Sequence, residues 1–334
     1  MKVNNKIFII YNISIYMTFS NEEKEKLKNK QYGIYGNHSA VQICEWTKNS
    51  LRKKGTCYKD KFYGVNTHKC AQITPTTIYC NHRCIYCWRP MEYMRKKDED
   101  WDEPKEIIDN LIEERKMLLS GFKGREGMDV DFFKDSLIPD HFAISLSGEP
   151  TLYPKIDELI AYLNDDYKAR TVFLVTNGTK PKTLKKISKN PPTQLYFSVN
   201  AHNKELFNKI TPKGDFEKLK ESLSLIPKMN TRTVIRVTII KGLNDENIEE
   251  FSEFLNKYDA DFIEIKSYMW IGNSRDRLKK QNMPTHNYIR KITKEMLKHM
   301  DKYEYENEQK RSRIVLLKNK SSNYKTKIQT KDGN

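Results

Sequence analysis

Three closely spaced cysteines are the residues of this chain with the clearest chemical potential. Cys80, Cys84 and Cys87 form a C-x3-C-x2-C motif. Structural zinc and ferredoxin-type clusters take four protein ligands, so three cysteines leave such a site one ligand short. On a four-iron cluster, three thiolates leave one iron open to chelate a small molecule and pass it an electron. A zinc knuckle, or three unrelated buried thiols, is the alternative interpretation.

A second set of three cysteines lies upstream with wide, equal spacing. Cys44, Cys57 and Cys70 belong neither to a ferredoxin-type run nor to a zinc ribbon, and three isolated buried thiols are the default interpretation. All six cysteines of the chain nevertheless precede residue 90. A second [4Fe–4S] cluster with its own open iron would account for that distribution, and its iron could hold a small chelating substrate.

Composition indicates a soluble chain with a large excess of positive charge. The 334 residues have room for one large α/β domain with additions, or for two small domains. Hydrophobic residues make up 37% of the chain, which is enough to build a core. The net charge of +16 and the isoelectric point near 9.3 suit a polyanionic partner, although a Lys-rich solvated surface produces the same values.

The sequence predicts no membrane segment and a reducing compartment. The apolar stretch at residues 6–17 is about half as long as a membrane-spanning helix must be. It lacks a strongly basic flank and an Ala-x-Ala-like cleavage site, which argues against a signal peptide. Six cysteines in a chain of this size do not indicate a secreted disulfide scaffold, so the cytoplasm is the expected location.

Strands and helices are expected to alternate from about residue 71. The expected strands are residues 73–79, 141–146, 171–175, 194–199, 233–240 and 261–266. The expected helices are residues 104–120, 154–165, 203–210, 215–225 and 246–257. Strand–helix–strand alternation implies a parallel sheet, and six repeats fit a partial barrel.

Polar residues follow each expected strand. They are Cys80, residues 147–150, residues 176–178, Ser198 with Asn200, residues 241–244, and Lys266 with Ser267. The carboxyl ends of the strands form the active-site face of a parallel barrel. Each group alone could be ordinary turn chemistry, but six consecutive strand ends with polar groups predict a single site.

These motifs resemble the radical S-adenosylmethionine (SAM) superfamily. There, three cysteines hold a [4Fe–4S] cluster whose open iron binds SAM, and electron transfer gives a 5′-deoxyadenosyl radical. Ser147-Gly148-Glu149 is similar to the element that binds the methionine amino group, and Tyr86 lies at the position that packs on adenine. The resemblance implies that SAM is bound by Tyr86, Ser147, Gly148, Glu149, Thr176, Asn177 and Ser198.

Within this superfamily, residues 30–318 resemble the tRNA 4-demethylwyosine synthases. The shared features are the wide cysteine triad, the C-x3-C-x2-C motif, residues 148–154, residues 264–266 and the Asn-Met-Pro-x-His element at residues 282–286. The resemblance implies a lyase that condenses N1-methylguanosine, beside the anticodon of tRNA(Phe), with two carbons of pyruvate. The product is 4-demethylwyosine, a tricyclic base of wybutosine biosynthesis. The implied cofactors are SAM and two [4Fe–4S] clusters, the second held by Cys44, Cys57 and Cys70.

The resemblance also implies a reactive lysine and an outside source of electrons. Lys59, two residues after Cys57, matches the position at which the family is thought to hold pyruvate as a Schiff base. The deoxyadenosyl radical would abstract hydrogen from the N-methyl group, and the carbon radical would add to this pyruvate. Only 79 residues precede Cys80, too few for the flavodoxin-like domain of eukaryotic members, so an external electron donor is expected.

A basic and aromatic segment near residues 282–286 is the expected tRNA-binding face. Its predicted contact residues are Trp270, Arg275, Arg277, Lys279, Lys280 and His286. Arg290, Lys291 and Tyr288 lie nearby in the sequence. Basic side chains bind phosphates and aromatic rings stack on bases of single-stranded loops. A solvated basic helix is the alternative interpretation.

The predicted architecture is an α/β partial (β/α)6 radical-SAM barrel with an N-terminal cluster-binding extension. Residues 1–29 are interpreted as an extension that is either a start-site artefact or disordered, since Met17 could open the reading frame. Residues 30–318 form the radical-SAM core with the cysteine segment, and residues 319–334 form a basic disordered tail. The chain is expected to be a monomer.

Two other functions fit part of this sequence. A glycyl-radical activating enzyme shares the three-cysteine motif, but it predicts a protein partner and extra cysteines in ferredoxin spacing. A non-catalytic iron–sulfur or zinc RNA-binding module predicts cysteines whose loss only unfolds the protein. Near eight irons per chain would support two clusters, four would support one, and zinc alone would exclude both enzymes.

Overall fold

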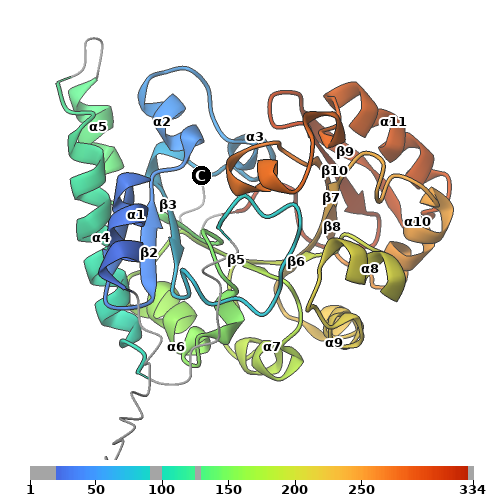
Figure 1. Ribbon diagram of the computed structural model, residues 1–334, viewed down its shortest axis with the longest axis horizontal. Coiled ribbons are helices and arrows are strands. Elements are labelled where there is room, and N and C mark those ends of the chain that lie inside the picture. The colour runs from blue at the N-terminus through green and yellow to red at the C-terminus, as the bar shows by residue number, and fades with distance from the viewer. Residues whose placement is uncertain (1–19, 91–99, 125–128, 330–334) are drawn as a thin grey trace, which may run out of the picture.

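The computed structural model describes residues 20–90, 100–124 and 129–329. Its centre is one curved sheet of ten strands in the order β1-β2-β3-β4-β5-β6-β7-β8-β10-β9 (Figure 1). The six middle strands are parallel: β3 (Cys70–Thr74), β4 (His141–Ile144), β5 (Thr171–Thr176), β6 (Gln194–Ser198), β7 (Arg232–Ile239) and β8 (Phe262–Ser267). The sheet is not closed, so the predicted partial (β/α)6 barrel is confirmed.

Antiparallel strands that the sequence analysis missed extend both edges of the sheet. They are β1 (Tyr32–Tyr35), β2 (Ser39–Gln42), β9 (Tyr303–Gln309) and β10 (Ile314–Asn319). Strand β9 reads YEYENEQ, and only its first residue is buried. A charged, solvated strand of this kind suits a sheet edge, because like charges discourage pairing with another chain. It gives almost no hydrophobic signal from which the sequence could have predicted it.

Side chains of the parallel strands alternate between two apolar environments. Outward residues such as Ile235 and Ile263 pack against the helices, whereas inward residues such as Val234 and Phe262 pack inside the barrel. This alternation follows from the two-residue period of a strand. Polar inward positions further along the same strands, such as Arg236, are thereby available to a site enclosed by the barrel.

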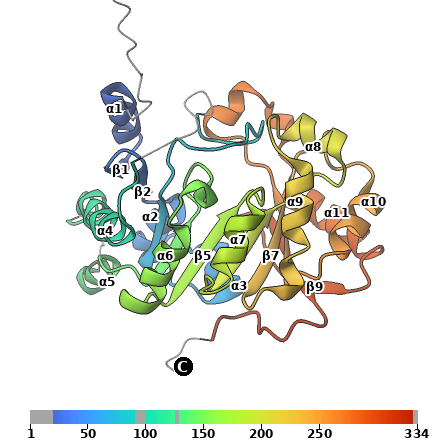
Figure 2. The same cartoon turned by 90° about the horizontal axis from the view of Figure 1, so that it is seen from below.

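Helices cover the outer face of the sheet, as Figure 2 shows from below. They include α4 (Pro104–Ser120), α6 (Ile156–Ala161, continued by a π-helical turn), α7 (Pro181–Ile187), α8 (Lys204–Ile210), α9 (Phe216–Leu223), α10 (Ile248–Asn256) and α11 (His286–Leu297). All five helices expected from the sequence are present, with ends shifted by at most a few residues. In the described part of the chain, no helix is long and apolar enough to cross a membrane.

The N-terminal region adds three shorter helices. A fourth short helix, α5, follows α4 in the chain and lies beside it. These helices are α1 (Asn21–Asn29), α2 (Glu45–Leu51), α3 (Tyr58–Tyr63) and α5 (Val130–Ser136). Ser20 and Glu23 form a reciprocal capping box at the start of α1. The predicted disorder of residues 1–29 therefore does not extend to residues 21–29, and the proposed start-site artefact lies outside the described residues.

The predicted disordered tail is wrong for residues 319–329. Asn319 ends β10, and the following segment crosses the amino ends of the strands, where Figure 2 shows it in red. The Arg232 guanidinium donates to the carbonyls of Lys325 and Thr326, and the Ile328 N–H donates to the Tyr63 carbonyl (3.1 Å). The buried guanidinium of Arg232 needs acceptors, and this segment supplies them.

Candidate functional site

The C-x3-C-x2-C motif lies in the loop that follows β3, at the carboxyl ends of the parallel strands. In Figure 1 this teal loop passes in front of the strands. The Ile85 N–H donates to the Ile210 carbonyl (3.0 Å), and the Arg83 N–H donates to the Pro212 carbonyl (3.0 Å). The Arg277 guanidinium donates to the carbonyls of Ile85 and Cys87. These bonds fix the loop at the carboxyl end of α8 and at the segment after β8.

The three thiols of this loop have the properties of metal ligands. Burial raises the pKa of Cys84 to about 12 and raises the pKa of Cys80 well above its usual range. The Cys87 thiolate adds repulsion to both. Three half-buried thiols that oppose one another's ionisation stay protonated without a cation, whereas a bound metal deprotonates them outright.

A single metal ion and a four-iron cluster need differently spaced donors. Across residues 20–90, 100–124 and 129–329, no three His, Cys, Asp or Glu side chains gather closely enough to hold a single metal ion. A four-iron cluster makes a different demand, because each thiolate binds a different iron atom. Three thiols on one loop that borders a cavity fit that demand.

A cavity of about 330 Å³ lies directly beside the cysteine loop. It is lined by seven of the predicted residues, namely Cys80, Cys84, Cys87, Tyr86, Ser147, Gly148 and Ser198. The Tyr86 hydroxyl accepts a hydrogen bond from Asn200 Nδ2 (2.6 Å), which anchors the ring to the end of β6. The volume is within the range of small-ligand pockets. The structure thus brings most of the predicted SAM site together around one cavity.

Three predicted SAM-binding residues do not line the cavity. They form hydrogen bonds that connect the segments around it. The buried Glu149 carboxylate accepts hydrogen bonds from the Thr151 N–H (3.1 Å), the Thr176 hydroxyl (2.6 Å) and the Asn177 N–H (2.7 Å). Burial raises the pKa of Glu149, and these hydrogen bonds oppose the rise. The Asn177 side chain pairs with Asn81 (2.9 Å). Glu149, Thr176 and Asn177 therefore join the ends of β4 and β5 to the cysteine loop.

Gly148 permits the closest backbone approach in the site. Its φ is +70°, and an added Cβ would lie 1.8 Å from the Thr76 carbonyl oxygen and 2.6 Å from that of Tyr79. Both carbonyls belong to the loop that leads into Cys80. Only glycine has the required backbone angle without a side chain that would displace the cysteine loop.

We expect Gly148→Ala to destabilise the protein by about 3 kcal/mol or more, because a strained backbone angle and a steric clash coincide. Iron bound at the C-x3-C-x2-C motif should fall as well. Urea unfolding and iron analysis of the reconstituted protein measure both effects. Gly242→Ala is the matched control: its φ is +79°, yet no atom lies within 4 Å of the added Cβ. It should cost only about 1 kcal/mol, and equal costs for the two variants would contradict the steric argument.

The wide cysteine triad meets inside the N-terminal part of the barrel. Cys44 and Cys57 are the N-cap residues of α2 and α3, and Cys70 begins β3. Burial raises the pKa of Cys57 to about 12, with further repulsion from Cys44 and Cys70. Burial also raises the pKa of Cys70 to about 11. The three thiols are therefore close enough for their charges to interact, which the sequence spacing alone did not establish.

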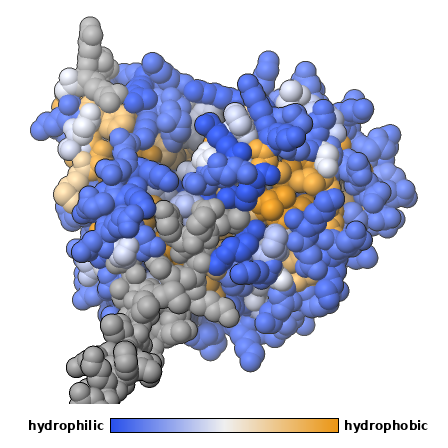
Figure 3. All heavy atoms as spheres, viewed as in Figure 1, coloured by the Kyte–Doolittle hydropathy of each residue, from blue (hydrophilic) through white to orange (hydrophobic). Residues whose placement is uncertain are grey.

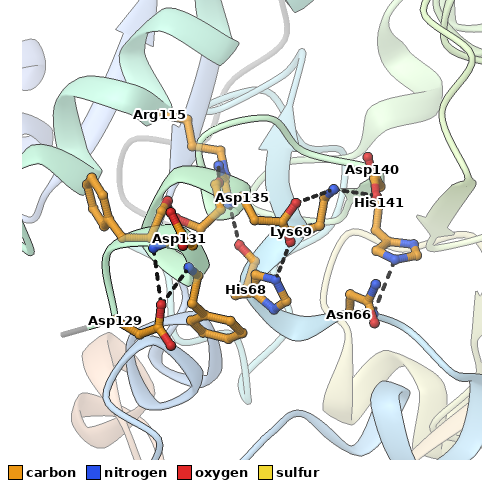
Figure 4. A network of polar contacts seen from close by, with 12 residues as sticks. Asn66, His68, Lys69, Arg115, Asp129, Asp131, Asp135, Asp140 and His141 are labelled. Carbon is orange, nitrogen blue, oxygen red and sulfur yellow. Dashed lines mark hydrogen bonds and ion pairs between the residues drawn. The ribbon is translucent and has the colours of Figure 1, made fainter. Parts of the chain in front are cut away.

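A polar network beneath Cys70 holds this triad in place. The fully buried Arg115 donates to the carbonyls of His68 (2.8 Å) and Cys70 (3.4 Å). Lys69 pairs with Asp135 (2.9 Å) and Asp140 (2.8 Å), as Figure 4 shows. Sequence analysis missed Arg115 because it lies on the regular amphipathic helix α4, and only its burial distinguishes it.

Lys59 lies on α3 inside the barrel. Its Nζ is 4.0 Å from the centre of the Phe173 ring and 5.3 Å from that of Tyr196. Burial lowers the pKa of Lys59, and the thiolates of Cys70 and Cys57 oppose this. A lowered pKa favours the neutral amine, the form of lysine that attacks a carbonyl.

The cavity lining includes residues that the sequence analysis did not assign to the site. The inward side chains of β7 and β8 contribute Arg236, Thr238 and Lys266. Burial lowers the pKa of Lys266 to about 8, with repulsion from Arg236 and Lys59 and attraction from Cys57. Lys266 therefore lies between the first cavity and the wide triad. Its place at a strand end was noted from sequence, but nothing there indicated its neighbours.

The predicted tRNA-contact residues fall into two groups. Arg275, Lys279 and Lys280 are exposed, and the Arg275 guanidinium lies 4.8 Å from the centre of the half-buried Trp270 ring. Arg277 instead binds carbonyls of the cysteine loop. His286 is buried with 7% of its surface exposed, and its Nε2 lies 3.5 Å from a Glu308 carboxylate oxygen. The expected RNA contact of His286 is therefore wrong for this structure, because its position at the start of α11 faces the sheet.

The mouth of the cavity carries exposed apolar side chains. Trp88 and Ile271 line it with 38% and 41% of their surfaces exposed. The Arg89 guanidinium lies 3.2 Å from the centre of the Trp88 ring. Figure 3 shows that this face is mostly hydrophilic, with an apolar patch to the right of its centre.

Comparisons with known proteins agree on one family. The profile of the Radical SAM superfamily matches residues 74–255, and that of wyosine base formation matches residues 257–319. The chain is 41% identical to the S-adenosyl-L-methionine-dependent tRNA 4-demethylwyosine synthase of Pyrococcus abyssi, over 89% of this chain and 88% of that protein. For the enzyme of the same name from Methanocaldococcus jannaschii, the identity is 37% over 92% and 99%. A solved structure described as TYW1 with a lysine-pyruvate adduct bound superposes with a TM-score of 0.84 and 35% identity, over 93% of this chain and all of that one.

Proposed function

The chain belongs to the radical SAM superfamily and, within it, to the tRNA 4-demethylwyosine synthases of wyosine formation, and we propose that it condenses N1-methylguanosine of tRNA(Phe) with pyruvate. The observation that carries this proposal is the meeting of two cysteine triads and a buried lysine around one barrel interior. A glycyl-radical activating enzyme has no need of the second triad or of that lysine. Residues 30–318 would act as one catalytic unit.

Cys80, Cys84 and Cys87 would hold the [4Fe–4S] cluster that the superfamily implies. A cluster bound there supplies the electron that cleaves SAM to a 5′-deoxyadenosyl radical. Tyr86, Ser147, Gly148 and Ser198 would contact SAM directly, because they line the cavity. Glu149, Thr176 and Asn177 would act as positioning residues that keep the strand ends and the cysteine loop in register. The electron would come from an external donor.

Cys44, Cys57 and Cys70 would hold a second cluster, and Lys59 would bind pyruvate as a Schiff base. Two observations support this assignment. Cys44 and Cys57 both cap short helices, so backbone N–H groups lie next to sulfur atoms that must carry negative charge. A solved relative that superposes closely is described as carrying a lysine-pyruvate adduct. Lys59 is the buried lysine beside the triad.

The tRNA would approach the mouth of the cavity. A purine beside the anticodon must be unstacked to reach a buried site, and exposed aromatic rings stabilise unstacked bases. Trp88 and Ile271 provide apolar surface at the mouth. Trp270, Arg275, Lys279 and Lys280 would contact the anticodon arm beside them.

Anaerobic incubation of the reconstituted protein with SAM, pyruvate, dithionite and tRNA(Phe) containing N1-methylguanosine tests the proposal. Nucleoside mass analysis should detect 4-demethylwyosine, with 5′-deoxyadenosine and methionine as co-products. Omission of pyruvate, and tRNA with unmethylated guanosine, are the controls. Deoxyadenosine without any tricyclic base, under conditions in which both clusters are present, would contradict the proposed substrates but not the family.

A further inference from the structure

Among the described residues, three cationic side chains inside the barrel interact electrostatically with the Glu264 carboxylate. Lys59 comes from α3, Arg236 from β7, and Glu264 and Lys266 from β8. In the sheet register, Arg236 pairs with Glu264, and Thr238 pairs with Lys266. Paired residues of parallel strands project to the same side of a sheet, so these groups share the enclosed face. Glu264 contributes to the electrostatics of all three cations.

Glu264 is already fully engaged by neighbours other than the two lysines. Its Oε2 accepts from Arg236 Nη2 (2.7 Å) and Nε (2.8 Å), and its Oε1 accepts from the hydroxyls of Tyr63 (2.8 Å) and Tyr196 (3.3 Å). The side chain is completely buried. Arg236 also donates to the Tyr58 hydroxyl (2.6 Å). The Arg236–Glu264 ion pair is therefore neutral overall, and the Glu264 oxygens accept their hydrogen bonds from Arg236, Tyr63 and Tyr196.

The two lysines differ from Arg236 in having no such partner. Among the described residues, no hydrogen bond or ion pair links the ammonium group of Lys59 or of Lys266 to an acidic side chain. Lys266 Nζ lies 5.5 Å from the centre of the Tyr58 ring. Burial, together with repulsion from Arg236 and Lys59, lowers the pKa of Lys266 to about 8. Lys266 is half-buried at the cavity wall. An ammonium group that is partly withdrawn from water without a counter-ion is costly, so this position favours an incoming anion.

We propose that Lys266 binds the carboxylate of the α-keto acid while the neutral amine of Lys59 condenses with its ketone carbonyl, forming the C=N bond of an imine and releasing the carbonyl oxygen as water. This inference rests on the proposed function, because it takes pyruvate as the substrate. Lys266 lines the cavity beside the C-x3-C-x2-C motif. It also interacts electrostatically with Cys57 of the wide cysteine triad and with Lys59. That position beside Lys59 favours the keto acid over SAM, the other carboxylate in the reaction. Lys266 would hold the carboxylate end of the adduct at the boundary between the two sites.

Lys266→Met tests the proposal, because methionine has similar length without the charge. In the reconstituted enzyme we expect the KM for pyruvate to rise about tenfold to 100-fold, the usual effect of losing a charged hydrogen bond. Borohydride trapping of labelled pyruvate on Lys59 should need correspondingly higher concentrations. Lys266→Arg retains the charge and should recover most of the affinity. The exposed Lys228→Met is the control and should leave both values unchanged.

Other measurements on Lys266→Met decide whether Lys266 binds the carboxylate of pyruvate or the carboxylate of SAM. The SAM dissociation constant and the iron content should match the wild type. Weaker SAM binding with an unchanged KM for pyruvate would overturn the proposal and assign Lys266 to SAM. Loss of iron from the wide triad would also overturn it, because Lys266 would then support the cluster. A wild-type enzyme that makes no tricyclic base would refute the proposed function itself, whereas an active enzyme with an unaffected Lys266→Met variant refutes only this inference.

Discussion

Replacing Cys84 with alanine is expected to abolish SAM cleavage while the wide cysteine triad keeps its cluster. The structure places Cys84 in the loop after β3, and Cys44, Cys57 and Cys70 around α2, α3 and the start of β3. We propose that these are two separate ligand sets. Iron per chain should therefore fall by about half. Iron and sulfide analysis, with chromatographic detection of 5′-deoxyadenosine, measures both effects. No 5′-deoxyadenosine should form above background.

The reciprocal variant supplies the control for this experiment. Cys70→Ala should also lose about half of the iron. It should still cleave SAM, because the residues that line the cavity beside the C-x3-C-x2-C motif are unchanged. Thermal unfolding of both variants separates loss of a ligand from loss of the fold. Complete loss of iron in either variant would mean that the six cysteines form one interdependent site, contrary to the two sites proposed.

Lys59→Arg is expected to eliminate the tricyclic base and to spare SAM cleavage. Arginine retains the positive charge beside Phe173, but its guanidinium does not deprotonate in proteins and cannot form a Schiff base. We expect product formation to fall by about a thousandfold or more, as for the loss of other covalent nucleophiles. 5′-Deoxyadenosine should still form, uncoupled from product. Borohydride with labelled pyruvate should mark the wild type at Lys59 and leave the variant unlabelled.

Lys61→Arg is the matched control, two residues further along α3. Its exposed Nζ donates to the Glu308 carbonyl (2.6 Å), a bond that arginine can also make. This variant should retain wild-type activity and labelling. Wild-type product formation by Lys59→Arg would place the Schiff-base step on another residue. Lys266, the half-buried lysine of the cavity wall, would be the next residue to test.

Local patterns in the sequence were sufficient for the chemistry and for the core of the fold. The C-x3-C-x2-C spacing indicates an open iron site because ligand count and spacing are local properties. The six parallel strands follow from short β-rich runs, and the five expected helices follow from apolar residues repeating every 3.6 residues. Polar residues at strand ends such as Ser147 and Ser198 were correctly expected on one face, because parallel strands all end at the same edge.

The functions of individual polar residues required the tertiary structure. Glu149 and Asn177 lie at the expected strand ends, yet their side chains bind other parts of the protein and not the cavity. His286 lies in the expected basic segment, but the direction of α11 buries it. The tail beyond Asn319 is polar in composition, and only the buried Arg232 explains why residues 325 and 326 dock.

The sequence by itself determined which chemistry this chain can carry, because cysteine spacing and the order of strands are properties of the linear chain. Only the tertiary structure decided which charges meet inside the barrel. Arg236 and Glu264 are separated by a whole strand–helix repeat, and the sheet register brings them together. Buried parallel strands are apolar on both faces, so their sequences do not indicate which face is enclosed. Enclosure of one face leaves Lys59 buried and Lys266 half-buried at the cavity wall, both without acidic partners among the described residues. This is the feature from which the keto-acid site is inferred.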